Sequence, residues 1–134
     1  MVNEIIFCDI SINKYKKKQL EINTDLNVKF INKDAWIEIR RLSKIDLLFY
    51  RRDGMSEGGS GIEVLQDDFL SLVLKKFPKV GGSIITDGSN ANRDYRFKNM
   101  CEKGLELASF KITKSNQQPF SSHNLTKFDV HPNV

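Results

Sequence analysis

The chain has 134 residues, which is enough for one domain and too few for two ordinary ones. Hydrophobic residues make up 40% and charged residues 28%, with a formal net charge of +4, as in ordinary soluble globular proteins. No stretch approaches the ~20 apolar residues of a membrane span, and two cysteines form neither a disulfide framework nor a zinc quartet. Membrane proteins, disulfide-rich secreted domains and zinc fingers are therefore disfavoured, and we expect one cytoplasmic domain over residues 1–134.

Strands and helices are expected to alternate along the chain. Apolar runs predict strands over residues 5–10, 28–31, 45–50, 83–86, 105–113 and 124–130. Helices are predicted over residues 12–22, 62–77 and 92–103, and a short helix or turn over 35–42. This alternation predicts an α/β fold with a mostly parallel sheet flanked by helices. The last two strands are expected to be antiparallel because no helix joins them.

Acidic residues follow each of the four expected parallel strands. They are Asp9, Asp34, Asp53 and Asp87. In open sheets of this kind ligands bind at the carboxyl ends of the strands, and a carboxylate at a strand tip can accept hydrogen bonds from a ribose diol. Each acid alone is also typical of a helix N-cap or a turn, but four of them at one edge favour a binding site.

Four segments in this order resemble the class I S-adenosylmethionine-dependent methyltransferases, which have a Rossmann-like fold. Ile-Phe-Cys-Asp-Ile-Ser at residues 6–11 is similar to their second strand, and residues 28–35 to their third strand and the Asp-Ala pair after it. Residues 45–50 are similar to their fourth strand, and 79–87 to their Gly-Gly turn and fifth strand. The closing antiparallel pair is also similar to the end of that family, so the resemblance covers residues 4–131.

The resemblance implies S-adenosylmethionine as the methyl donor and assigns residues to it. Asp9, with Ile10 beside it, would bind the ribose hydroxyls. Asp34 would accept a hydrogen bond from the adenine amino group, and the backbone N–H of Ala35 would serve a ring nitrogen. Trp36 would cover the adenine face, or else belongs to the core.

The resemblance also places candidate catalytic and acceptor-binding residues around the fourth and fifth strands. Tyr50, Asp53 and Glu57 are the candidate catalytic residues, with the two acids acting as a general base or orienting a nucleophile. The candidate substrate-binding residues are Arg51, Arg52, Asp87 and Asn90. Family members that methylate the amino groups of adenine or cytosine carry Asn/Asp-Pro-Pro-Tyr at the place where this chain has Tyr-Arg-Arg-Asp. The difference disfavours base amino groups as the methyl acceptor. The sequence does not otherwise distinguish nucleic acids, proteins, sugars and small molecules as acceptors.

The chain departs from the family at its start. The family's first strand carries a Gly-x-Gly-like turn and lies centrally, between the second and fourth strands, but only four residues precede Ile5. We therefore expect a domain that is truncated at its N-terminus relative to the family. A complementing chain, or a strand swapped within a homo-oligomer, would then complete the donor site.

Two other interpretations stay open. In the first, the chain is a non-catalytic Rossmann-like remnant or binding module. In the second, it is a phosphate- or nucleotide-binding enzyme in which the backbone N–H groups of the glycine-rich loop 53–61 bind the anion. The basic run at residues 14–18 is typical of a solvated helix face and only weakly favours a nucleic-acid partner. His123 and His131 lack partners at metal-ligand spacing, so we expect no metal site.

Overall fold

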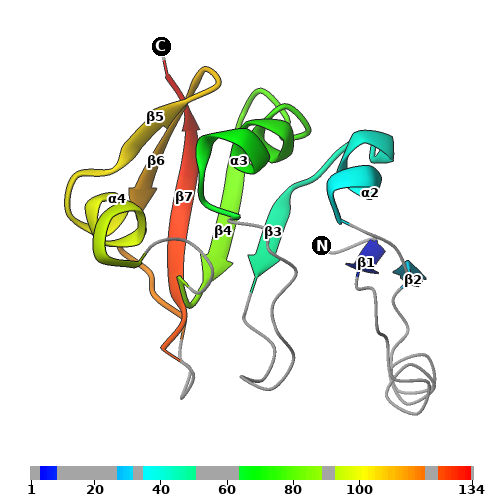
Figure 1. Ribbon diagram of the computed structural model, residues 1–134, viewed down its shortest axis with the longest axis horizontal. Coiled ribbons are helices and arrows are strands. Elements are labelled where there is room, and N and C mark those ends of the chain that lie inside the picture. The colour runs from blue at the N-terminus through cyan, green and yellow to red at the C-terminus, as the bar shows by residue number, and fades with distance from the viewer. Residues whose placement is uncertain are drawn as a thin grey trace. The chain divides into compact units, whose positions relative to one another are not determined.

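The computed structural model describes residues 4–8, 27–31, 35–50, 64–88, 93–119 and 124–133 (Figure 1). Its contacts divide the chain into two compact units, residues 1–42 and 43–134, and each is described by itself. The predicted helix over 12–22 and the glycine-rich loop 53–61 lie outside the described residues. The expectation of a single domain over residues 1–134 stays a prediction.

The first unit contains a parallel strand pair and a helix. Strands β1 (Glu4–Cys8) and β2 (Asn27–Ile31) run side by side, with Cys8 opposite Ile31. Helix α2 (Ala35–Arg41) follows and has basic residues in its last turn, where they complement the helix dipole. One of them, Arg41, bonds Glu38 one turn earlier at 3.2 Å. The strand predicted over 5–10 is confirmed over residues 5–8, and its last two residues lie outside the described residues. The strand predicted over 28–31 is confirmed, and the short helix or turn predicted over 35–42 is a helix.

The second unit is a five-stranded mixed sheet flanked by helices. Its strands are β3 (Leu47–Tyr50), β4 (Gly82–Thr86), β5 (Leu105–Leu107), β6 (Phe110–Lys114) and β7 (Thr126–Pro132). Their spatial order is β3-β4-β7-β6-β5 (Figure 1). The helices are α3 (Asp67–Leu74), the π-helix η1 (Arg93–Phe97) and α4 (Lys98–Lys103). The α/β class predicted from the sequence is thus confirmed.

The expectation of a mostly parallel sheet is wrong for this unit. Only β3 and β4 pair in parallel, whereas β4–β7, β7–β6 and β6–β5 are antiparallel. The predicted strand over 105–113 is in fact a hairpin, because Ala108 and Ser109 turn the chain with φ values of 51° and 69°. Two-residue turns with positive φ normally carry Asn-Gly or Asp-Gly, so this turn has no sequence signal.

The core lies between the sheet and the helices. Alternate residues of the central strands are buried, and Ile84 lies opposite Phe128 while Ile112 lies opposite Val130. The buried side chains of the helices are Phe69, Leu70, Val73 and Leu74 from α3 and Met100 from α4. In Figure 1 both helices lie in front of the sheet, and an ion pair between Arg96 and Asp67 joins η1 to the start of α3.

Helix α3 is shorter than its apolar pattern predicts. The predicted range was 62–77, but Gln66 has extended backbone angles and the helix begins after it. At the other end, bonds from Lys76 N–H to Val73 O and from Phe77 N–H to Leu74 O tighten the chain into a turn. A proline at position 78 disfavours helical angles in the residue before it. Val64, Leu65 and Phe77 are still buried, which is why the apolar pattern extends past the helix.

In the described part of the chain, no helix has both the length and the apolar character needed to cross a bilayer. The cytoplasmic location itself stays a prediction.

Candidate functional site

The carboxyl ends of β3 and β4 lie side by side in the second unit. Tyr50 is paired with Thr86 in the parallel register, and Asp87 follows Thr86 directly. Strand β7 begins at the same end, with Thr126 opposite Thr86. Tyr50 and Asp87 are both half-buried. The structure therefore brings together two of the residues that the sequence predicts for the site.

A buried turn holds the backbone after β4. Thr86 has no exposed surface, and its hydroxyl oxygen accepts a hydrogen bond of 3.1 Å from the Gly88 N–H. Gly88 has a φ of 75°, and a Cβ there would lie 2.6 Å from the Phe97 ring. Phe97 in turn packs edge-on against Phe128, with ring centroids 6.0 Å apart. Asp87 is thus held between two residues whose positions are fixed by the core.

Phe97 is the last residue of the π-helix η1. Helices of this kind are rare and occur frequently at functional sites. Here η1 returns the chain from the end of β4 to the start of α4, and its final ring closes over Gly88. No sequence pattern distinguished this segment from an ordinary helix over 92–103.

The remaining predicted site residues are placed only partly or not at all. Ala35 and Trp36 form the first turn of α2, and only their backbone is described. The predicted donor-site residues Asp9, Ile10 and Asp34 lie outside the described residues, as do Arg51, Arg52, Asp53, Glu57 and Asn90. The parallel register of β1 and β2 does place the ends of these two strands at one edge. Their assigned roles stay predictions.

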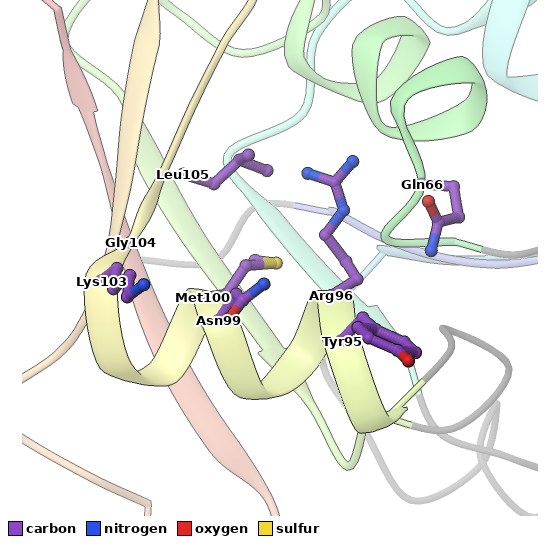
Figure 2. Close-up of a pocket in the computed structure, with 8 residues that line it drawn as sticks. All are labelled: Gln66, Tyr95, Arg96, Asn99, Met100, Lys103, Gly104 and Leu105. Atoms are coloured by element: carbon purple, nitrogen blue, oxygen red, sulfur yellow. The ribbon is translucent and has the colours of Figure 1, made fainter.

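A pocket of about 490 Å³ lies between the start of α3 and the helices η1 and α4 (Figure 2). Its lining combines apolar surface, to which Met100 and Leu105 contribute, with the polar groups of Gln66, Tyr95, Asn99 and Lys103. Arg96 also lines it and points toward α3, where Asp67 compensates its charge. The sequence analysis missed this pocket, because its residues form no recognisable motif.

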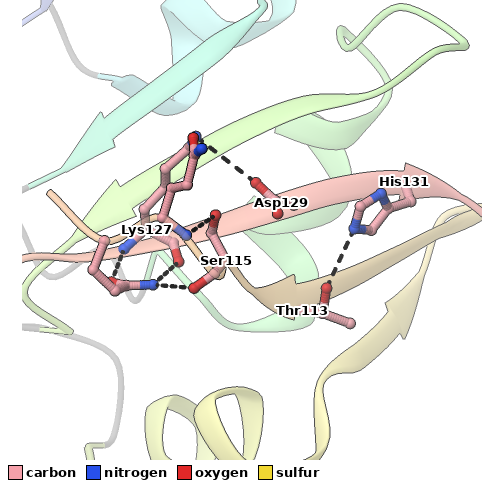
Figure 3. Close-up of polar contacts among 7 residues, drawn as sticks. Thr113, Ser115, Lys127, Asp129 and His131 are labelled. Carbon is pink, nitrogen blue, oxygen red and sulfur yellow. Dashed lines mark hydrogen bonds and ion pairs between the residues drawn. The ribbon is translucent and has the colours of Figure 1, made fainter.

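The sheet face opposite the buried one carries a row of polar side chains (Figure 3). Lys127, Asp129 and His131 alternate along β7 with buried residues and therefore share one face. The ammonium of Lys127 lies 3.9 Å from the carboxylate of Asp129, and the Thr113 hydroxyl lies 3.3 Å from Nε2 of His131. The first contact lies along β7 and the second joins β6 to β7, so these polar groups are paired with one another on this face of the sheet.

The side chain of Gln118 extends the pairing of β6 with β7 beyond Lys114. Its amide nitrogen donates to the carbonyl oxygens of Ser115 at 2.7 Å and Lys127 at 3.0 Å, and its oxygen accepts from the Lys127 N–H at 2.9 Å. The Ser115 N–H also bonds the Lys127 carbonyl at 3.0 Å. The Gln118 side chain therefore makes the hydrogen bonds to Lys127 that the backbone of a strand residue would make.

Titratable groups in the described residues offer little reactive chemistry. The described residues contain no group of three His, Cys, Asp or Glu side chains that could hold a metal ion. Burial raises the pKa of the Cys101 thiol, while the nearby Lys114 ammonium lowers it and the Glu102 carboxylate raises it. A thiol with a raised pKa is a poor nucleophile near neutral pH.

We expect Cys101 to react more slowly with iodoacetamide at pH 8 than free cysteine, because its raised pKa leaves less thiolate. The rate should rise only at a higher pH than for free cysteine. Lys114→Gln should slow the reaction further and Glu102→Gln should speed it, since the two charges act in opposite directions. Mass spectrometry of the Cys101 peptide measures these rates, and an equal rate in all three proteins would contradict the assigned causes.

No protein-family model matches the chain, and no curated protein matches it.

Proposed function

We propose that the chain is an S-adenosylmethionine-dependent methyltransferase-like protein that takes its donor at the carboxyl ends of its parallel strands. The observation that carries the proposal is the strand arrangement. The pairs β1–β2 and β3–β4 are both parallel, in the chain order that the resemblance requires. The last strand, β7, lies antiparallel between β4 and β6, in agreement with the closing antiparallel pair on which the resemblance also rests.

The residue chemistry at these strand ends fits such a donor. It carries a ribose diol and an adenine amino group, which donate hydrogen bonds, and a sulfonium cation. Carboxylates suit all three, and Asp9 and Asp34 follow β1 and β2 in the sequence. When bound, the donor supplies an electrophilic methyl group, and the protein needs only to hold donor and acceptor in line.

The strand order supports the second part of the proposal, that a further strand completes the site. In the described part of the chain, β1 has β2 as its strand neighbour and β3 has β4. Each pair therefore has an edge strand that could accept a partner, and unpaired edges are readily completed by another chain. A complementing chain or a second copy would supply that strand. The proposal includes the cytoplasmic location expected from the sequence.

Calorimetric titration with S-adenosylhomocysteine tests the proposal, with the solution mass determined on the same sample. We expect about one ligand per chain in an oligomer or complex, and weak binding or none by an isolated monomer. Asp9→Ala and Asp34→Ala should each abolish binding, because each removes a predicted contact to the ligand.

The matched control is Asp46→Ala, which removes an exposed carboxylate at the opposite end of β3 and should leave binding unchanged. Micromolar binding by a monomer would contradict the need for a further strand. A folded chain that binds nothing at millimolar ligand as a monomer, as an oligomer and in complex with a complementing chain would contradict the methyltransferase proposal. That result would favour a non-catalytic binding module.

A further inference from the structure

We propose that the pocket between the start of α3 and the helices η1 and α4 binds a small organic oxyanion, in which a phosphate or carboxylate group is joined to an apolar body. The oxyanion binds at Arg96, and the Lys103 ammonium adds to its attraction. The residues involved all belong to the described part of the second unit, so this site does not depend on the proposed function.

The charges around the pocket favour an anion. Arg96 and Lys103 both line it, and none of the described residues that line it is acidic. Asp67 pairs with Arg96, whereas Lys103 is exposed and has no ion-pair partner among the described residues. Two lining cations are thus matched by one carboxylate, and the positive charge that is left attracts an anionic ligand.

Arg96 has hydrogen-bond donors to spare. A guanidinium carries five N–H donors in a planar fork that fits two oxygens of a carboxylate or phosphate. Among the described residues its partner is Asp67, which accepts from Nη2. No buried side-chain nitrogen or oxygen of the described residues lacks a hydrogen-bond partner, so the donors that Asp67 does not use are accessible.

The fold also holds this side chain in place. The Arg96 side chain is only 18% exposed, and Figure 2 shows it directed into the space between Leu105 and Gln66. An enclosed side chain loses little further freedom when it binds a ligand, which favours binding. Arg96 is therefore suited to receive an oxyanion from the pocket.

The size and apolar surface of the pocket favour an organic ligand over a bare inorganic ion. Buried Met100 and half-buried Leu105 contribute apolar surface, and the Tyr95 side chain beside them is 68% exposed. Pockets for small organic ligands combine such surface with a few polar groups and have volumes of about 300 to 1,000 Å³. A volume of about 490 Å³ lies within this range. An inorganic ion would leave most of this space to water.

Nuclear magnetic resonance titrations of the full chain test the inference, with phenyl phosphate and benzoate as the two aromatic anions. Benzyl alcohol has the ring without the charge, and inorganic phosphate has the charge without the ring. Dissociation constants come from the backbone amide shifts of residues 95–105. We expect both aromatic anions to bind about tenfold more tightly than either comparison compound, since a hydrogen bond to a charged group has this effect. The tighter of the two identifies phosphate or carboxylate as the preferred group.

Three variants test the assigned charges. Arg96→Gln should weaken the binding of both aromatic anions about tenfold, and Lys103→Gln about threefold. Asp67→Asn removes the carboxylate that competes for Arg96, so it should strengthen binding about threefold. The matched control is Lys111→Gln, which removes the same charge as Lys103→Gln from an exposed position on β6, opposite His131 on the other face of the sheet. It should leave binding unchanged.

The inference is overturned if the amides of residues 95–105 do not shift at millimolar phenyl phosphate and benzoate. Equally tight binding of benzyl alcohol or inorganic phosphate would overturn it too, as would unchanged binding in both Lys103→Gln and Asp67→Asn. Should Arg96→Gln not fold by circular dichroism, these two variants still decide, because both change exposed side chains. Neither result bears on the binding of S-adenosylhomocysteine, which is measured separately.

Discussion

Gly81→Ala is expected to destabilise the second unit by about 3 kcal/mol or more, because it combines backbone strain with a steric clash. Gly81 has a φ of 93°, and a Cβ there would lie 1.8 Å from the Val130 carbonyl oxygen. Its N–H also closes a turn by bonding the Pro78 carbonyl at 2.8 Å. The clash is with backbone, so relief requires β7 to move away from β4, which separates the two central strands.

Urea denaturation followed by circular dichroism measures this loss, and hydrogen exchange in the β6 and β7 peptides localises it to the second unit. The matched control is Val80→Ala, one residue earlier, whose side chain is 83% exposed. The control should change the free energy of unfolding by less than about 0.5 kcal/mol. Equal stability of the Gly81→Ala and wild-type chains would contradict the close approach of Gly81 to β7.

Phe128→Ala should destabilise the second unit by about 3 to 5 kcal/mol, as large truncations in protein cores do. Phe128 has no exposed surface and stands on the central strand β7, opposite Ile84 on β4. Its ring also packs against Phe97, 6.0 Å away between centroids. The alanine variant leaves a cavity between the sheet and η1 and removes the contact that holds Phe97 over Gly88.

The same urea titration measures this effect, and Phe49→Ala is the matched control. Phe49 lies on β3 and is 56% exposed, so its truncation should cost less than about 1 kcal/mol. A loss for Phe49→Ala as large as that for Phe128→Ala would contradict the exposure of this face of β3. A small loss for Phe128→Ala would contradict its place at the centre of the core.

Local sequence patterns predicted most of the individual elements of this chain. Apolar runs correctly indicated β1 to β4, because short apolar runs bounded by turn residues favour extended strands. Gly104, which follows the predicted helix over 92–103, does end α4, with a φ of 77°. The element boundaries were less accurate, since Val64, Leu65 and Phe77 are buried without being helical.

The sequence indicated which candidate residues stand at the strand ends. The acids after the strands are visible in the sequence, and the parallel register confirms that Tyr50 and Asp87 come to one strand end. The buried support of that end was not predicted. Thr86, Gly88 and Phe97 act together only because the fold brings residues from β4 and η1 into contact.

The sequence by itself determined the class of the fold, since apolar periodicity and turn residues act over short distances along the chain. Only the tertiary structure decided the order of the strands in the sheet and that most neighbouring strands of the second unit are antiparallel. The hairpin at Ala108 and Ser109 has no turn signature, and the position of β7 between β4 and β6 depends on pairing between segments far apart in the chain. Such pairings are set by the packing of residues such as Ile84 against Phe128, which no local pattern records.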